Sequence, residues 1–441
     1  MKYIYGLSKS GESILNYLNS INENYFCWDD NIKIRKKIKR INKKDNFIEP
    51  EKLNFELIKE SFITPGISLK NKKTNILKKY KVKLYRDLEL YSRIAHKKTI
   101  IAVTGTNGKS TTTKLISNIL EQNDIPNFMG GNIGIPLLDF PTKYNKLKHH
   151  VIELSSYQLE SFKKFDPYIS ILLNISRDHL DRYKNFNEYI AQKEKLIISN
   201  RKGYKIICID DKHTYLIYQK YKKKIIPISS KPFKGSIFYE NNTIVDDFFE
   251  KNKKIELKEI SSSLFGNFNI QNILAAYAVS KILNINLIKF TNILAKFKGL
   301  PHRLELVFIN RKYRIINNSK STNLESLVNS IKNYTNINLI MGGRPKDKKF
   351  KKLLKYKNRI KKIYLIGESS KFISKDLENK ISFALCYNLQ NAIKNIFLDI
   401  KKEKKFTNII FSPGCASFDQ FKNFEERGDE FKRLIKKINH E

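Results

Sequence analysis

The sequence predicts an α/β protein with a Rossmann-like N-terminal domain, a central parallel-sheet domain of the P-loop ATPase type and a Rossmann-like C-terminal domain. Three observations lead to this prediction. Short β-type runs alternate with helical patterns from end to end, which is typical of parallel α/β sheets. The 441 residues exceed what one ordinary core holds. Hydrophobic residues make up 41% of the chain and aromatic residues 12%, which is enough for several packed domains.

The N-terminal domain is expected over residues 1–95. Residues 2–5 are predicted to form a strand that leads into a loop containing Gly6 and Gly11, and then into a helix that ends near Leu18. Residues 61–66 are predicted to be a strand that ends in a turn. This order of strand, glycine loop and helix indicates a small Rossmann-like unit, although two glycines alone are a weak signal.

The central domain is expected over residues 96–298 and begins with the apolar strand 99–103, a glycine-rich loop and the helix 110–120. Its other predicted elements are strands 150–154, 168–175, 204–209 and 224–228, a hairpin near 236–245 and a helix at 269–283. The C-terminal domain is expected over residues 299–441. Its predicted elements are a β-ribbon of residues 304–310 and 313–317 and strands 338–341, 362–366, 382–386 and 408–411, with helices between them.

The net charge is +41, from 84 basic and 43 acidic residues. Alone, this charge would suggest a nucleic-acid or anionic-membrane partner. The lysines are, however, spread along the whole chain among Ile and Asn residues, and no nucleic-acid motif is present, so we expect no specific nucleic-acid binding. A rival hypothesis, a nucleic-acid-binding P-loop NTPase, requires a Walker-B aspartate that we do not find.

The sequence also limits where the protein acts. No apolar run reaches the ~18–20 residues that a membrane span needs. The apolar segment at residues 1–6 is too short for the hydrophobic region of a signal peptide. We therefore expect a cytoplasmic protein without membrane insertion. The four cysteines lie far apart and form no CxxC pair, so neither disulfides nor a zinc site is expected.

The strongest local signal is the segment 104–110, Thr-Gly-Thr-Asn-Gly-Lys-Ser, between the strand 99–103 and a helix. Successive backbone N–H groups in such a loop wrap phosphates at a helix N-terminus, where the helix dipole favours anions. Lys109 is expected to reach the β- and γ-phosphates of ATP and Ser110 to bind Mg²⁺. The general P-loop pattern has glycine where this chain has Val103, so the loop belongs to a subclass.

This loop and several later blocks resemble the Mur ligase family, ATP-dependent enzymes that build amide bonds onto carboxylates. The blocks are 104–110, 130–134, 153–160, 174–183, 266–272 and 299–305. Two positions depart from the family's pattern: Phe268 stands where His is usual, and Asn318 replaces the Asp of an Asp-Ser-Lys block. The resemblance extends over the whole chain and is weakest over the first ~95 residues. It implies ATP and Mg²⁺ as cofactors.

Glu153 and His179 each lie at the C-terminal end of a predicted strand, which is the edge where open α/β sheets bind ligands. A carboxylate and a neutral imidazole beside a P-loop can hold Mg²⁺. The resemblance adds Lys193 as a lysine that CO₂ converts to a carbamate, so that the metal set would be Ser110, Glu153, His179 and carbamylated Lys193. Lys195 is the alternative, but on a helix it points about 200° away from Lys193. Lys109, His179 and Lys193 are the expected catalytic residues.

The resemblance also implies three binding sites. The expected ATP-binding residues are Gly105, Thr106, Asn107, Gly108, Lys109, Ser110, Thr111, Asn269, Arg303 and Asn318. The expected residues for a UDP-linked substrate are Ser8, Asn132, Ser155, Gln158 and His179. Asn132 could instead simply fill a left-handed turn position.

Within the family, the block 412–424 and the segments 317–323 and 342–346 resemble the branch that adds D-glutamate. Thr322, Lys346, Ser417 and Phe424 would then contact D-glutamate, since ammonium and hydroxyl donors suit a dicarboxylate. The reaction implied is the ATP-dependent addition of D-glutamate to UDP-N-acetylmuramoyl-L-alanine through an acyl phosphate in peptidoglycan synthesis, by a monomer. A sibling ligase for folate or for UDP-muramoyl-tripeptide is the alternative within the family.

Overall fold

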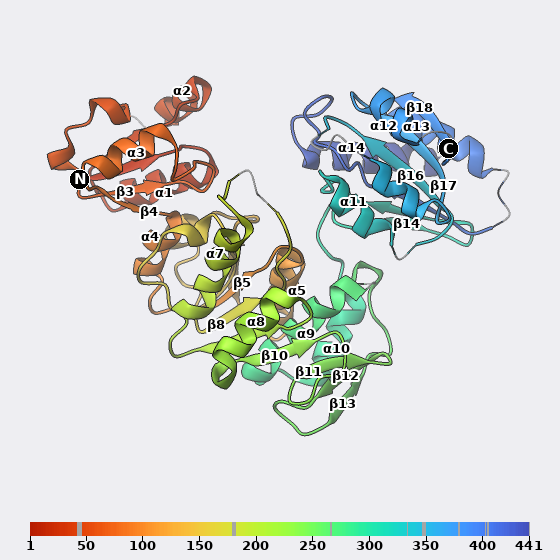
Figure 1. Cartoon of the computed structure of the whole chain (residues 1–441), viewed down its shortest axis with the longest axis horizontal. Helices are drawn as coiled ribbons and strands as arrows, with labels where there is room; N and C mark the ends of the chain where they lie inside the picture. The colour runs from red at the N-terminus through yellow and green to blue at the C-terminus, as the bar shows by residue number, and fades with distance from the viewer. Residues whose placement is uncertain are drawn as a thin grey trace. The chain divides into compact units, whose positions relative to one another are not determined.

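The structure is a computed structural model that describes residues 1–41, 46–178, 182–264, 267–332, 334–345, 350–377, 380–401, 403 and 405–440 (Figure 1). It divides into two compact units. Unit 1 comprises Met1–Ile260 and Asn267–Lys296, and unit 2 comprises Ser261–Gly266 and Phe297–Glu441. The three-domain division at 95/96 and 298/299 stays a prediction. Among the described residues, no helix has the length and apolar character to cross a membrane.

The first sheet of unit 1 has the strand order β2-β1-β3-β4, with neighbouring strands paired in parallel. Its strands are β1 (Lys2–Tyr5), β2 (Tyr25–Trp28), β3 (Glu60–Ile63) and β4 (Lys83–Tyr85). The helices that accompany them are α1 (Lys9–Ser20), α2 (Ile32–Ile41), α3 (Lys72–Lys79) and α4 (Asp87–Ile94). Gly6, between β1 and α1, has a φ of +95°, and an added Cβ would collide with Thr64 after β3. The Gly6 loop and the Thr64 turn therefore lie at one edge of the sheet.

The second sheet of unit 1 has the order β13-β12-β11-β10-β9-β8-β5-β7-β6. Pairing is parallel from β6 to β11 and antiparallel for β11, β12 and β13. Its strands are β5 (Thr99–Thr104), β6 (Asn127–Gly131), β7 (His149–Glu153), β8 (Ile169–Leu172), β9 (Tyr204–Cys208), β10 (Ile226–Ser229), β11 (Ile237–Glu240), β12 (Thr243–Asp246) and β13 (Lys253–Glu256). Its helices are α5 (Lys109–Glu121), α6 (Phe140–Lys143), α7 (Phe186–Ser199), α8 (Lys212–Tyr221), α9 (Asn267–Ile282) and α10 (Leu287–Lys296).

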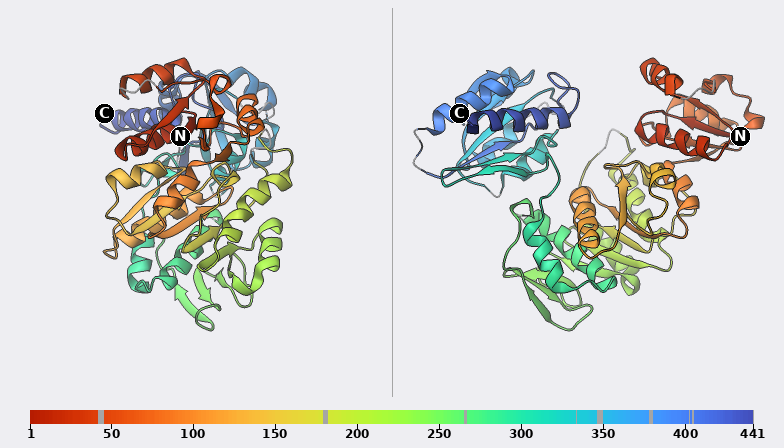
Figure 2. Two further views of the ribbon diagram at one scale, coloured as in Figure 1. Left: turned by 90° about the vertical axis from the view of Figure 1, so that its left-hand side faces the viewer. Right: turned by 180° about the vertical axis from the view of Figure 1, so that it is seen from behind.

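The sheet of unit 2 has the order β14-β15-β19-β16-β17-β18, with β14 antiparallel at one edge. Its strands are β14 (Glu305–Ile309), β15 (Tyr313–Asn317), β16 (Ile337–Gly342), β17 (Ile360–Ile366), β18 (Phe383–Tyr387) and β19 (Thr407–Phe411). Leu339 packs with α11 (Leu324–Ile331) and α12 (Ser370–Leu377), whereas the next residue, Ile340, packs with α13 (Leu389–Ile400) and α14 (Phe424–His440). Successive strand residues thus fill opposite layers, and Figure 2 shows α14, in dark blue, lying across one face.

Several helices begin at Asn or Asp residues whose side chains accept a backbone N–H of the first turn, which satisfies a donor that the helix itself leaves unpaired. These residues are Asn71 before α3, Asn185 before α7, Asp211 before α8, Asn323 before α11 and Asn388 before α13. The frequent Asn of this composition therefore also marks where helices start.

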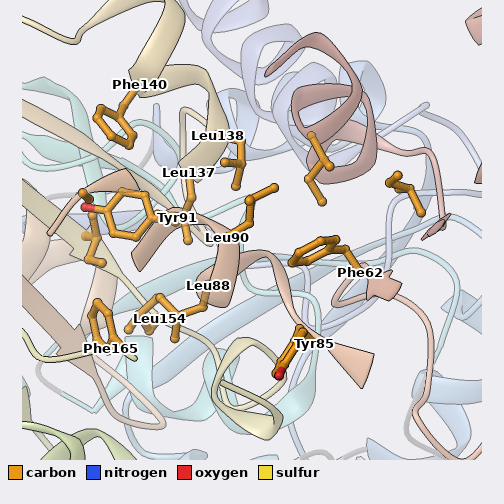
Figure 3. Close-up of a cluster of buried hydrophobic side chains, with 14 of the residues drawn as sticks. Phe62, Tyr85, Leu88, Leu90, Tyr91, Leu137, Leu138, Phe140, Leu154 and Phe165 are labelled. Carbon is orange, nitrogen blue, oxygen red and sulfur yellow. The ribbon is translucent and has the colours of Figure 1, made fainter. Parts of the chain in front are cut away.

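One hydrophobic core joins the first sheet of unit 1 to the second. The helix α4 lies at its centre: Leu88, Leu90 and Tyr91 are buried beside Phe62 of the first sheet and Leu154 after β7 (Figure 3). Because this core is continuous, α4 has a fixed position with respect to both sheets.

At one end of this core, the imidazole of His150 is buried among aromatic rings. Its Nδ1 shares a 2.8 Å hydrogen bond with the hydroxyl of Tyr91, and its ring centroid lies 4.7 Å from that of Phe140. Burial, with a smaller effect from the charge of Lys98, lowers the pKa of His150 to about 4.

We expect His150 to make unit 1 sensitive to acid. Since its pKa is depressed in the folded state, the unfolded chain takes up the proton first. Stability is therefore present above the unfolded pKa of ~6.5 and is lost as the pH falls towards 4, by about 2 kcal/mol at pH 4.5 relative to pH 7. Urea unfolding followed by the fluorescence of Trp28, the single tryptophan of the chain, measures this loss.

The matched variants are His150→Phe, which keeps an aromatic ring but cannot bind a proton, and His96→Phe, which removes an exposed imidazole. His150→Phe should lose about 2 kcal/mol less than the wild type between the two pH values, whereas His96→Phe should lose as much as the wild type. An equal loss in His150→Phe and the wild type would contradict this account.

Candidate active site

The P-loop follows the carboxyl end of β5, and β5 lies between β7 and β8 in the second sheet. Gly108 has a φ of +82°, and an added Cβ would collide with Oδ1 of Asn272 on α9. Glycine is therefore required here by its conformation and by the close approach of a neighbouring helix. Behind it, α5 begins at Lys109, so that the loop N–H groups and the positive end of the helix dipole meet where phosphates would bind.

Lys109 folds back over the loop. Its Nζ donates to the carbonyl oxygens of Gly105 at 2.9 Å and Thr106 at 2.8 Å. The hydroxyl of Thr106 is held in turn by the backbone N–H of Ser176 at 3.0 Å and shares a 2.9 Å hydrogen bond with the hydroxyl of Tyr189. The ammonium of Lys109 thus lies on a loop that is anchored to the segment after β8 and to α7.

A chain of side-chain amides anchors the other flank of the loop. The backbone N–H of Asn107 donates to Oδ1 of Asn174 at 2.8 Å, and Asn174 donates to Oε1 of Gln271 at 2.9 Å. Asn272 donates to Oδ1 of Asn269, which is buried, and accepts from Thr112 on α5. The predicted ATP residue Asn269 therefore lies beside the P-loop helix. The roles of Asn174, Gln271 and Asn272 were not predicted, although all three lie in the blocks 174–183 and 266–272.

Glu153 ends β7 in register with Val103 of β5 and Gly131 of β6. Its side chain is buried, and Oε1 accepts from Nδ2 of Asn132 at 2.7 Å. Its other oxygen, Oε2, accepts no hydrogen bond from any residue that the structure describes. A buried carboxylate oxygen without a donor favours a cation. Glu153 therefore fits a Mg²⁺ ion, and the hydroxyl of Ser110, in the first turn of α5, would be a second oxygen ligand.

Lys193 lies on α7 and is 1% exposed. Its Nζ donates to the carbonyl oxygen of Gly105 at 2.7 Å, so that the side chain reaches the P-loop. Burial, and secondly the charge of Lys109, lowers its pKa far below the usual value. Lys195 points elsewhere and donates to the carbonyl oxygen of Glu160 at 2.7 Å. Of the two lysines, Lys193 is thus the one at the nucleotide loop.

The residues predicted for the UDP-linked substrate lie in unit 1. Ser8 is exposed and precedes α1 at the carboxyl end of β1. Oε1 of Gln158 accepts from the backbone N–H of Ser155 at 3.1 Å and from its hydroxyl at 3.2 Å. Asn132 lies one residue after β6, bound to Glu153 as described above.

The remaining predicted residues lie in unit 2. Asn318 follows β15; its Oδ1 accepts from the backbone N–H of Leu304 at 3.2 Å, and its Nδ2 donates to the hydroxyl of Ser412 at 3.1 Å. The neutral amide at this departure from the family pattern thus serves as acceptor and donor together. Arg303 lies one residue before Leu304, and Thr322 precedes the cap of α11.

Ser417 is buried after β19, and Phe424 begins α14 with the ammonium of Lys320 over its ring, 3.7 Å from the centroid. Arg427, which is 1% exposed, links the segments 317–323 and 412–424. Its guanidinium donates to the carbonyl oxygens of Ser319 at 2.8 Å and Cys415 at 3.1 Å. Burial lowers the pKa of Arg427 to about 10. Sequence reasoning missed this arginine, whose contacts join segments about a hundred residues apart.

Two predicted residues lie outside the described residues: His179 and Lys346. The same holds for Gly266 and for the side chain of Phe268. Unit 1 therefore contains the P-loop, Glu153, Asn132 and Lys193, and unit 2, taken by itself, contains the blocks around Asn318 and Ser417.

A P-loop at the carboxyl edge of a parallel sheet, with a buried carboxylate and a buried lysine against it, defines a nucleotide-dependent α/β enzyme. Residues 103–280 match the family described as Mur ligase middle domain. The chain is also 36% identical to the UDP-N-acetylmuramoylalanine–D-glutamate ligase of Rickettsia bellii, covering 99% of this chain and 97% of that one. It therefore belongs to the Mur ligase family, whose enzymes are ATP-dependent ligases.

Other comparisons agree with this membership. The ligase of the same name from Wolbachia pipientis is 33% identical, covering 99% of this chain and 96% of that one. Among solved structures, the UDP-N-acetylmuramate–alanine ligase of Thermotoga maritima aligns over 99% of both chains with a TM-score of 0.62 at 17% identity. That likeness confirms the predicted fold class, the three-domain α/β fold of Mur ligases.

Proposed function

We propose that this chain joins D-glutamate to UDP-N-acetylmuramoyl-L-alanine at the expense of ATP in peptidoglycan synthesis. One observation carries the proposal: an oxygen of buried Glu153 that no described residue hydrogen-bonds and the buried amine of Lys193 flank the P-loop. The names of the full-length relatives support this choice of substrates, as does the D-glutamate-type block at 412–424. A nucleic-acid-dependent NTPase offers no reason for this pair of groups.

The proposed reaction has two steps. The carboxylate of UDP-N-acetylmuramoyl-L-alanine attacks the γ-phosphorus of ATP, which gives an acyl phosphate and ADP. The amine of D-glutamate then attacks the acyl carbon, and phosphate leaves from the tetrahedral intermediate with formation of the amide. Lys109 neutralises the charge on the transferred phosphoryl group, and the loop N–H groups hold the phosphates in position.

Ser110, Glu153, His179 and a carbamylated Lys193 would hold Mg²⁺, which would neutralise phosphate charge. A lysine reacts with CO₂ as the neutral amine, which burial already favours at Lys193. The amine nitrogen bonds to the carbon of CO₂ and releases a proton to solvent, which leaves a carbamate anion. The remaining N–H can still donate to the carbonyl oxygen of Gly105, so the contact seen here is compatible with the modification.

The other residues are assigned to substrates. ATP would contact residues 105–111, Asn269, Arg303 and Asn318. UDP-N-acetylmuramoyl-L-alanine would contact Ser8, Asn132, Ser155, Gln158 and His179. D-glutamate would contact Thr322, Lys346, Ser417 and Phe424. We also propose that the enzyme is a cytoplasmic monomer without a specific nucleic-acid partner.

The test is phosphate release with ATP, UDP-N-acetylmuramoyl-L-alanine and a panel of amino acids. In the presence of ATP and UDP-N-acetylmuramoyl-L-alanine, D-glutamate should support turnover. L-glutamate, D-glutamine, D-alanine, DNA and RNA should not. Stimulation by DNA or RNA without D-glutamate, or equal use of L-glutamate, would overturn the proposal.

Substitution of the proposed D-glutamate residues should change substrate affinity selectively. Ser417→Ala and Lys346→Ala each remove a donor to a carboxylate, so we expect KM for D-glutamate to rise ~10- to 100-fold while KM for ATP stays within about twofold. Ser374→Ala and Lys371→Ala, on α12 of the same unit, are controls and should leave both values unchanged. An unchanged KM for D-glutamate in both test variants would remove this site assignment.

A further inference from the structure

Asp87, the first residue of α4, is a buried carboxylate to which the reaction above assigns no role. Its side chain is 2% exposed. The helix that carries it is fixed by Leu88, Leu90 and Tyr91 in the core shared by both sheets of unit 1 (Figure 3). Asp87 therefore presents its carboxylate from a rigid support.

Both oxygens of Asp87 accept hydrogen bonds. Oδ1 accepts from the backbone N–H of Leu88 at 3.0 Å, and Oδ2 accepts from Nε2 of Gln158 at 3.2 Å. The opposite end of the same amide, Oε1 of Gln158, faces Ser155 and accepts from its backbone N–H and its hydroxyl. A chain of hydrogen bonds thus runs from α4 to Ser155.

The chemistry of the carboxylate gives this chain its direction. The amide of glutamine has a donor end and an acceptor end of nearly the same shape, so its orientation depends on its neighbours. An ionised carboxylate accepts at both oxygens and donates at neither, so it can face only the NH₂ end of Gln158. The carbonyl end must then face Ser155. An asparagine at position 87 has an accepting oxygen at only one of these two positions and an NH₂ group at the other, so it cannot present an acceptor to both Leu88 and Gln158 as the carboxylate does.

We propose that Asp87 is a positioning residue that sets the amide of Gln158, and through it the hydroxyl of Ser155, in the orientation that binds the UDP-linked substrate. The inference rests on the proposed function, in which Ser155 and Gln158 contact that substrate. Burial raises the pKa of Asp87 to about 6, and the carboxylate is still ionised at neutral pH.

A second buried carboxylate on α4 provides the matched control. Glu89 is 1% exposed; its Oε2 accepts from the backbone N–H of Lys163 at 2.6 Å, and its Oε1 accepts from Nε of Arg93 at 2.9 Å. Its hydrogen bonds thus join the same helix to the segment that follows residue 160 rather than to Gln158. A general effect of loosening α4 would appear in variants of either carboxylate.

The experiment measures steady-state kinetics of the full-length enzyme for each substrate separately. Asp87→Asn should raise KM for UDP-N-acetylmuramoyl-L-alanine about tenfold, the factor typical of one lost hydrogen bond to a charged group. It should leave kcat and the KM values for ATP and D-glutamate within about twofold, and Glu89→Gln should change none of these. Asp87→Ser, which has a single oxygen, carries the same expectation should Asp87→Asn fail to fold.

A double-mutant cycle separates a positioning role from a general one. Added to Gln158→Ala, Asp87→Asn should raise KM no further, because the amide that it orients is gone. An unchanged KM in folded Asp87→Asn, an equal effect of Glu89→Gln, or additive effects in the cycle would each overturn the inference. A wild-type enzyme without D-glutamate-dependent turnover would instead overturn the proposed function, so the two failures are distinct.

Discussion

Lys109→Ala should lower D-glutamate-dependent phosphate release by about a hundredfold or more, because one preorganised cation at a site of developing charge typically contributes that much. The side chain lies over the loop on the carbonyl oxygens of Gly105 and Thr106 rather than inside a core. Its removal should therefore leave the fold unchanged. Phosphate release at saturating substrates, with circular dichroism and Trp28 fluorescence as checks of folding, measures both expectations.

The matched control is Lys114→Ala on the same helix, α5. This variant removes the same charge from a position farther along the helix, and its activity should stay within about twofold of the wild-type value. Near-wild-type phosphate release from a folded Lys109→Ala protein would rule out the assignment of this loop to ATP.

Lys193→Ala should be nearly inactive, with a loss of about a hundredfold or more, because it removes the proposed carbamate from the metal site. A short-chain carboxylate such as acetate should restore part of the activity by filling the vacated anion position. The amine of Lys193 at the loop should also yield a carbamate signal in ¹³C NMR of enzyme equilibrated with ¹³CO₂.

Lys195→Ala is the control for Lys193, since it lies on the same helix but donates to the carbonyl oxygen of Glu160. It should remain active, gain nothing from acetate and keep the ¹³C signal. An active Lys193→Ala enzyme in CO₂-depleted buffer would rule out the carbamate, as would a ¹³C signal that persists in this variant.

Local signals carried most of what the sequence predicted. The P-loop is one continuous segment, and its strand, glycines and helix could be identified together; the helix begins at Lys109, one residue earlier than predicted. Helical geometry showed that only one of Lys193 and Lys195 can face the nucleotide. The resemblance favoured Lys193, with Lys195 as the alternative; the contact of Lys193 with Gly105 joins residues 88 positions apart and depends on how α7 packs against the P-loop.

Other features could not be predicted because they depend on distant partners. The contact between Asp87 and Gln158 joins residues 71 positions apart, and Arg427 contacts Ser319 across 108. The strands β2, β4, β6 and β13 were also not predicted. β6 contains two adjacent glycines, and β13 is a polar edge strand, so neither has the apolar alternation that marks a strand.

The continuous core around α4 has a consequence for how such chains can recombine. A crossover between relatives at residue 95 would separate Leu88, Leu90 and Tyr91 from those core residues that lie beyond residue 95, such as Leu154. The two halves would then have to match in side-chain volume as closely as any protein interior does. In any recombinant, the first sheet and the P-loop sheet are therefore expected to pack well only as a matched pair from one parent.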